Sequence, residues 1–287
     1  MIKITLDLGA DIHENANKYF SKSKKIKNKL PGVENIIIKT QKEIKEFEKN
    51  KEEYLKKKEI KSIIEKNQKD QWFEKFRYSY TSGGYLFVFG KDSGTNEVLL
   101  KKHLKPEDII FHTEAPGSPF GIVKNALKLE GDKKIVLLDK KQLNEVAQVI
   151  CCFSKQWKKG FGTADAFWVY PEQVSKKANT GEYIAKGSFM IRGEKHILKN
   201  NILQIALGVE KKIVPNEDSN KKENISYYEL FSGSEEAVKK KCGQRYVKLE
   251  PGQDKYKTIS KEIKKRLKVD IESLPTWIPN ESKVLKR

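Results

Sequence analysis

The sequence is short of cysteine and of long apolar runs, and each shortage excludes a class of protein. It holds 3 cysteines in 287 residues, with Cys151 beside Cys152 and Cys242 far along the chain. An odd number without a C-x-x-C pair offers neither a disulfide framework nor a zinc site, which indicates a reducing compartment. The opening residues, MIKITLDLGADIHENA, lack the apolar core of a signal peptide, and no apolar run reaches membrane-spanning length. The sequence therefore predicts a soluble cytoplasmic protein without a membrane partner.

The usual signatures of catalysis are missing as well. There is no P-loop and no G-x-S-x-G motif, and GFGTAD follows an expected helix and precedes an expected strand, the reverse of a dinucleotide-binding unit. One alternative stays open, because Asp108, His112 and Glu114 would share one face of a strand. There they suit hydrogen bonding or phosphate contact, or else a metal-dependent nuclease. We expect a protein that is not an enzyme and uses no cofactor and no metal.

What the chain has in excess is positive charge. It carries 58 Lys and Arg against 39 Asp and Glu, a formal net charge of +19 at pH 7. A charge of this size repels itself unless a polyanion is bound, so RNA, DNA or an anionic membrane is the first expected partner. The alternative is a non-catalytic scaffold protein whose lysines only solvate its surface.

Residues 1–69 are expected to form a basic helical arm. A helix from Glu14 to about residue 29 would be followed by a break at LPGVEN and by a second helix over about residues 33–67. The second helix repeats apolar residues at coiled-coil spacing, at Ile37, Ile44, Phe47 and Tyr54. Because neither helix would be stable alone in water, the sequence predicts an antiparallel helical (coiled-coil) hairpin.

Residues 70–287 are expected to form one α+β domain around a mixed sheet. Helices are predicted over residues 140–158, capped by Asp139, and over about residues 255–268; Ser232 and Glu235 suggest the cap of a third. SGGYLFVFGKDSGTNEVLL is typical of two strands around a turn. Further strands are predicted, from their β-branched and aromatic residues, in DIIFHT, AFWVY, KGSFMIRG, NILQIALGV and QRYVKLE.

Residues 173–196, QVSKKANTGEYIAKGSFMIRGEKH, have the composition of a nucleic-acid surface. Lysine and arginine neutralise phosphates, hydroxyls donate to them, and Tyr183 or Phe189 would suit base stacking as well as core packing. A second basic group follows HTEAPGSPFGIV. The candidate RNA-binding residues are Arg77, Lys101, Lys102, His112, Lys124, Asn125, Ser175, Lys176, Lys177, Lys186, Arg192 and Lys195.

Several of these stretches together resemble a known family. WFEKFRYSYTSGGYLFVFGKDSGTNEVLL, HTEAPGSPFGIVKN and FWVYPEQVSKKANTGEYIAKGSFMIRGEKH are similar to the NFACT-R domain of the archaeal and eukaryotic NEMF and bacterial RqcH proteins, and ITLDLGADIHENANKYF resembles the start of their coiled-coil region. The resemblance implies binding to large ribosomal subunits stalled with peptidyl-tRNA, in ribosome-associated quality control. It carries over Arg77, Asn96, Glu97, His112, Lys124, Asn125, Ser175, Lys176, Arg192 and Lys195, although Asn96 and Glu97 would equally satisfy buried backbone groups.

Two departures from the family pattern bear on the expected partners. The large N-terminal domain (NFACT-N) and helix-hairpin-helix segments of the family do not precede residue 1, which predicts a separately encoded half that associates with this chain. In HTEAPGSP, Glu114 and Gly117 stand where the family tends to an H-x-D-x-x-G-like pattern. The expected partners are therefore ribosomal RNA of the large subunit, tRNA or peptidyl-tRNA, and the missing half.

Overall fold

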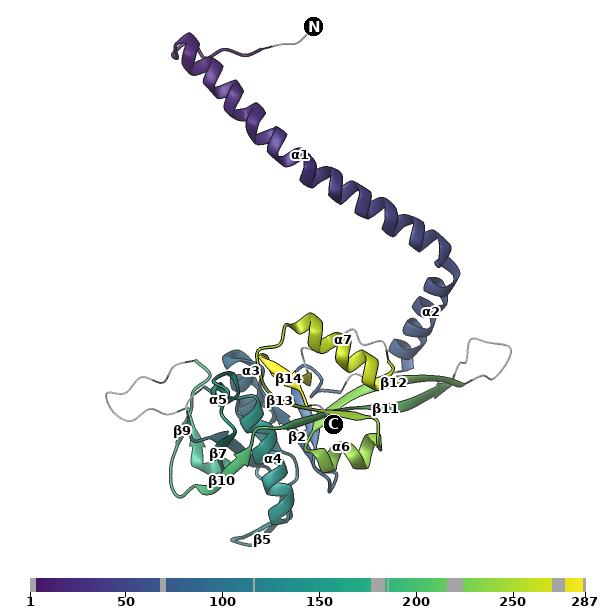
Figure 1. Ribbon diagram of the computed structural model, residues 1–287. Coiled ribbons are helices and arrows are strands. Elements are labelled where there is room, and N and C mark those ends of the chain that lie inside the picture. Colours follow the sequence, from purple (N-terminus) through teal and green to yellow (C-terminus); the bar gives the residue numbers. More distant parts are fainter. Residues whose placement is uncertain are drawn as a thin grey trace. The chain divides into compact units, whose positions relative to one another are not determined.

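A computed structural model describes residues 4–67, 71–115, 117–176, 184, 186–215, 224–269 and 277–285 (Figure 1). The chain divides into two compact units, residues 1–68 and 69–287. Within the described residues no helix is both long enough and apolar enough to cross a membrane.

The first unit consists of two successive helices, α1 (Ile12–Lys49) and α2 (Lys51–Asn67). The predicted break at LPGVEN is wrong, because α1 continues through Pro31 and Gly32 and ends at Lys49. Proline removes one backbone hydrogen bond and glycine lowers helix propensity, but the helix continues across both residues. The predicted antiparallel hairpin is also wrong. The two helices follow one another along the chain (Figure 1). Every apolar side chain described in α1 is exposed.

A compact cap precedes α1. The buried amide of Asn15 donates to the carbonyls of Asp7, Ala10 and Asp11 and accepts from the Asp7 amide. Asn15 therefore satisfies several backbone groups of the turn that leads into the helix.

The second unit is built on a six-stranded sheet with the order β1-β2-β4-β3-β7-β10. Every pairing in it is antiparallel, so the α+β class is confirmed but the mixed sheet is not. The predicted strands DIIFHT and AFWVY are present as β3 and β7. The strand bounds are β1 (Arg77–Tyr80), β2 (Leu86–Phe89), β3 (Ile109–Thr113), β4 (Gly121–Val123), β7 (Thr163–Val169) and β10 (His196–Ile202).

Helix α4 (Lys140–Cys152) packs its apolar side, which includes Val146, Ala147 and Ile150, into the main core beside this sheet. Asp139 caps it as predicted by accepting from the Gln142 amide. The helix does not run on to residue 158, because Ser154 caps a separate short helix, α5 (Lys155–Lys158). Serine competes for backbone groups and so favours caps over helix interiors.

The segment after β2 is helical and not the predicted second strand. Asp92 and Thr95 form a reciprocal capping box that starts α3 (Ser93–Val98), and a π-helical turn (Leu99–His103) continues it. The side-chain cap favours the helix over the strand that NEVLL would suggest by pattern alone. Leu99 and Leu100 are buried in a second core on the sheet, with Phe76, Phe120 and Phe167.

The C-terminal part adds a second antiparallel sheet with the order β12-β11-β13-β14. NILQIALGV is split between β10 and β11, and the cap of α6 is Ser234, while Ser232 lies in β12. These elements are β11 (Ile205–Pro215), β12 (Asn224–Gly233), α6 (Glu235–Cys242), β13 (Tyr246–Pro251), α7 (Tyr256–Leu267) and β14 (Ser282–Val284).

Two small ladders complete the unit. β5 (Leu127–Glu130) pairs with β6 (Lys133–Val136). After a 3-10 turn (Pro171–Gln173), β8 (Val174–Ser175) pairs with β9 (Met190–Ile191), so KGSFMIRG contains only a two-residue strand.

Candidate functional site

A groove of about 590 Å³ opens at one end of the six-stranded sheet. β2 and β3 finish at this end, and β1 and β4 begin there, so the antiparallel order brings Gly90, His112, Arg77 and Phe120 to one place. We call it the basic groove after its cationic lining residues, Arg77, Lys91, Lys155, Lys158 and Lys186. Among the described lining residues, Asp92 is the sole carboxylate, and the capping of α3 already occupies it.

One wall joins the start of α3 to the turn before β9. Gly187 has φ +79°, and a Cβ there would lie 2.5 Å from the Cα of Ser93. Only glycine permits this approach at this backbone conformation. The Gly187 amide donates to Glu97 Oε2 at 3.3 Å, which holds the turn that carries Lys186 and Phe189.

The opposite wall is α5. Ser154 Oγ accepts from the Gln156 amide and donates to the Cys151 carbonyl, and this fixes the helix that presents Lys155 and Lys158. Gly117, at φ +93°, packs against the Lys155 side chain, since a Cβ there would lie 2.4 Å from Lys155 Cε. The end of the Lys155 side chain therefore lies against Gly117, which also lines the groove.

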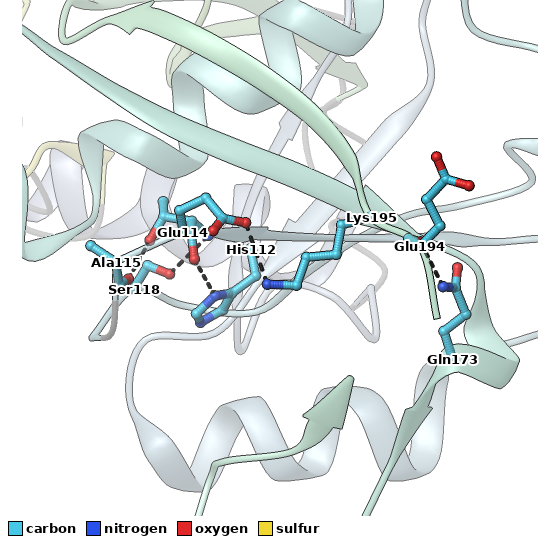
Figure 2. A network of polar contacts seen from close by, with 8 residues as sticks. His112, Glu114, Ala115, Ser118, Gln173, Glu194 and Lys195 are labelled. Atoms are coloured by element: carbon cyan, nitrogen blue, oxygen red, sulfur yellow. Dashed lines mark hydrogen bonds and ion pairs between the residues drawn. The ribbon is translucent and has the colours of Figure 1, made fainter. Parts of the chain in front are cut away.

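The floor is partly aromatic and holds a histidine. The His112 ring lies 4.3 Å from the Phe120 ring, and its Nδ1 lies 2.7 Å from the Thr113 carbonyl oxygen (Figure 2). A carbonyl only accepts, so Nδ1 carries the proton and Nε2 is an acceptor in the neutral ring. Burial lowers the pKa of His112, so the ring is neutral at neutral pH.

Arg77 has a double role at this end of the sheet. Its Nη1 donates to the carbonyls of Gly90 and Lys91, at 3.3 and 3.4 Å, and the guanidinium lies over the Phe153 ring at 4.9 Å. Burial lowers the pKa of Arg77, while Asp92 opposes that shift. Its buried Nε has no hydrogen-bond partner among the described residues. Arg77 thus supports the loop and brings positive charge to the groove.

Glu97 gathers two of the predicted lysines beside the groove. Its carboxylate lies 2.6 Å from Lys101 Nζ and 3.8 Å from Lys176 Nζ. Lys176 also donates to the Ser188 carbonyl and lies over the Phe189 ring at 5.0 Å. Glu97 therefore serves the fold, and its neighbour Asn96 does too, since Asn96 Oδ1 accepts from the Phe120 amide.

The remaining predicted residues of this region are tied to the β8–β9 ladder and its surroundings. Arg192 Nη1 donates to Ser175 Oγ at 2.6 Å. Lys195 Nζ lies 3.4 Å from Glu114 Oε1, and Gln173 donates to the carbonyls of Arg192 and Glu194 (Figure 2). The structure therefore pairs these cations within the chain. Lys177, Thr180 and Tyr183 lie outside the described residues.

Lys124 and Asn125 are placed away from the basic groove and have structural contacts. Lys124 Nζ donates to Asp108 Oδ2 at 2.5 Å and to the His103 carbonyl. The backbone amide of Asn125 donates to Asp108 Oδ1. Asp108 itself is fully buried. Lys102 lies exposed on the π-helical turn.

The distances do not fit the alternative of a metal-dependent nuclease that uses Asp108, His112 and Glu114. Asp108 and His112 share a face of the strand but are four residues apart, or roughly 13 Å at strand spacing, too far to hold one ion. Asp108 is paired with Lys124, and Glu114 with Lys195. No group of three His, Cys, Asp or Glu among the described residues is placed to hold a metal.

Sequence reasoning missed Lys91, Lys155 and Lys158. The helix predicted over residues 140–158 includes Lys155 and Lys158, and lysines near the end of a helix are explained by the helix dipole. The serine in CCFSKQWKK was the available signal, because it marks a second helix start that turns both lysines toward the groove.

The comparisons with known proteins cover the same stretch of the chain. The family model "NFACT protein RNA binding domain" matches residues 71–193, which contain all five cations of the basic groove. The archaeal Rqc2 homolog aRqcH of Methanocaldococcus jannaschii is 40% identical over 151 residues, which is 53% of this chain and 21% of that protein.

Two animal proteins match over more of this chain. The ribosome quality control complex subunit NEMF homolog of Drosophila melanogaster is 31% identical over 252 residues (82% of this chain, 24% of that protein). The human ribosome quality control complex subunit NEMF is 34% identical over 193 residues (67% of this chain, 17% of that protein). The chain thus spans a quarter or less of the length of these relatives. With the NFACT RNA-binding domain and these matches together, the chain belongs to the Rqc2, NEMF and RqcH family.

Proposed function

We propose that this chain is a cytoplasmic RNA-binding factor of ribosome quality control, which contacts large-subunit RNA and peptidyl-tRNA through the basic groove. The supporting observation is the charge of the groove. Its lining has five cationic side chains and one carboxylate, and all six belong to the residues that match an RNA-binding domain. Lysine and arginine at such a surface neutralise phosphates and supply sequence-independent affinity. The relatives' names connect the family with ribosome quality control.

In this proposal the chain acts by binding and carries out no bond-breaking step. The two carboxylates nearest in sequence to His112, those of Asp108 and Glu114, are each engaged by a lysine. His112, neutral and packed on Phe120, then has a place in the groove floor as a hydrogen-bond acceptor.

Co-sedimentation with purified large ribosomal subunits, with and without peptidyl-tRNA, tests the proposal. The wild-type chain is compared with a groove variant, Lys155→Ala/Lys158→Ala/Lys186→Ala. A matched control, Lys133→Ala/Lys199→Ala/Lys257→Ala, removes the same charge from exposed lysines elsewhere in the second unit. None of these six lysines forms an ion pair or a side-chain hydrogen bond with another described residue, which keeps the comparison to surface charge.

We expect salt-sensitive binding that is stronger to the subunits with peptidyl-tRNA, is reduced in the groove variant and is kept in the control. Equal loss in both variants would favour the scaffold alternative, with charge acting only in bulk. RNA degradation in the presence of divalent metals that disappears in His112→Ala would instead favour the nuclease alternative.

The helical arm supports a second, finer part of the proposal. Ile37, Ile44 and Tyr54 are 49%, 51% and 50% exposed, although they recur at coiled-coil spacing. Long helices with an exposed apolar stripe are stabilised in water by a partner helix. We propose that another helix of the family architecture, from its NFACT-N or helix-hairpin-helix segments, packs on this apolar stripe.

Mixing this chain with those segments, produced as a second polypeptide, and measuring complex formation by sedimentation velocity tests the proposed contact of the arm. Ile37→Glu/Ile44→Glu should abolish the complex, while Lys39→Glu/Lys42→Glu, on neighbouring polar positions, should leave it largely intact. If the Ile37→Glu/Ile44→Glu chain still forms the complex, the contact lies in the second unit and not in the arm.

A further inference from the structure

We propose that the basic groove holds one unpaired nucleotide, with its base on the aromatic floor and its phosphates between the lysines of the two walls. This inference rests on the proposed RNA binding and makes it specific. It assigns the groove to a single-stranded or bulged segment, in place of the outside of a duplex.

The size and lining of the groove fit such a ligand. About 590 Å³ is within the roughly 300–1,000 Å³ of clefts that bind small molecules. The lining combines three phenylalanines, Phe120, Phe153 and Phe189, with five cationic side chains. A duplex keeps the faces of its bases stacked inside and offers backbone and base edges, so it has no base face for the aromatic rings, whereas an unstacked base does.

The aromatic rings are arranged as stacking surfaces and not only as core. Phe153 and Phe189 are half-buried, while Phe120 between the sheet and the groove is buried. A cation already lies over each of the two half-buried rings, Arg77 over Phe153 at 4.9 Å and Lys176 over Phe189 at 5.0 Å. Phenyl rings and guanidinium planes are the surfaces on which proteins stack unpaired bases.

The charges of the groove are unmatched, in contrast to those around it. Lys101, Lys176 and Lys195, outside the lining, each lie within 4 Å of a carboxylate. No ion pair with a described residue is formed by the lining lysines Lys91, Lys155, Lys158 and Lys186. Burial, and after it the nearby Arg77, lower the pKa of Lys91, while Asp92 opposes that shift. The five cationic side chains of the lining thus face one carboxylate, and a phosphate would balance the remaining positive charge.

Two polar groups in the lining remain to recognise the base. The Arg77 Nε is buried without a partner among the described residues, and His112 offers an acceptor nitrogen when neutral. A donor and an acceptor beside an aromatic floor suit the edge of a nucleobase, whose edges carry both kinds of group.

A double-mutant cycle, in which the RNA and the protein are each changed alone and together, tests the inference. An RNA hairpin with one bulged adenosine is compared with the same hairpin carrying an abasic residue at that position and with the fully paired hairpin. Each is titrated against the wild-type chain, Phe189→Leu and Phe153→Leu by fluorescence anisotropy. Leucine keeps the apolar volume nearly constant but removes the stacking face. Thermal unfolding of each variant identifies any that fail to fold.

We expect the wild-type chain to bind the bulged hairpin roughly 5- to 100-fold more tightly than the abasic one, as stacking of one base supplies. The preference should shrink in at least one leucine variant, with affinity for the paired hairpin unchanged. If all three RNAs bind equally and with the same salt dependence, the nucleotide site is wrong although RNA binding stands. If none binds, the proposed function itself fails.

Discussion

At the scale of single residues, charge in this chain has two separate jobs. Lys124 is tied to the fully buried Asp108 and is only 12% exposed, whereas Lys155, Lys158 and Lys186 line the groove without a carboxylate partner. Both kinds of lysine appear alike in the sequence. Some pairs are local, such as Glu97 with Lys101 four residues on, but others depend on tertiary contacts, such as Glu114 with the distant Lys195.

Lys124→Ala should destabilise the second unit by about 3–5 kcal/mol, because it leaves a buried carboxylate unpaired. Lys128→Ala is the matched control, since Lys128 pairs with Glu130 on the exposed surface and such pairs contribute about 0–1 kcal/mol. Urea unfolding measures both. A Lys124→Ala chain that unfolds like the wild type but binds RNA more weakly would return Lys124 to the RNA-binding residues.

His112 gives the fold a dependence on pH. Burial lowers the pKa of His112 in the folded chain below its pKa in the unfolded chain. At a pH between these two pKa values the unfolded state therefore binds more protons than the folded state. The free energy of unfolding should therefore fall as the pH is lowered from 7 through the unfolded value of about 6.5. The pKa of His103 is lowered too, so His112→Gln should remove part of this slope. Urea unfolding at pH 7, 6 and 5 measures it, and an unchanged slope in His112→Gln would contradict the assignment.

At the scale of elements, the sequence predicted what depends on local pattern. β3, β7 and α7 lie where their apolar periodicity placed them, and Asp139 caps α4. The errors come where a side-chain cap or a single residue outweighs the pattern. Asp92 turns NEVLL into helix, Ser154 divides the helix predicted over residues 140–158, and Pro31 is tolerated inside α1. The groove walls depend on the first two of these features, which is why its lysines could not be assembled from the sequence.

The turn that carries Lys186 and Phe189 depends on Gly187. Gly187→Ala should cost about 1–3 kcal/mol of local strain, because φ is +79° and the new Cβ would meet the Ser93 backbone. We expect a displaced turn and weaker RNA binding, measured by anisotropy and by hydrogen exchange of residues 186–191. Gly162→Ala is the control, since nothing lies within 4 Å of a Cβ there. Equal RNA affinity in the two variants would show that the turn does not contribute to the site.

At the scale of the whole molecule, the charge of +19 is divided between two units with different surfaces. The first presents exposed apolar side chains on a basic helix, and the second concentrates unmatched cations in a groove at the end of a sheet. A net charge predicts a polyanionic partner but not where it binds. The antiparallel strand order supplies the location, because it gathers the ends of β2 and β3 with the starts of β1 and β4.

The salt dependence of RNA affinity tests most directly whether the basic groove is the RNA site. We predict that the logarithm of the association constant falls linearly with the logarithm of salt concentration, by about 0.7 for each single-strand phosphate contacted. Lys155→Ala/Lys158→Ala/Lys186→Ala should make that slope shallower by roughly 2, while the Lys133, Lys199 and Lys257 alanine control keeps the wild-type slope. Identical slopes in all three proteins would contradict the account and place the RNA contacts elsewhere on the chain.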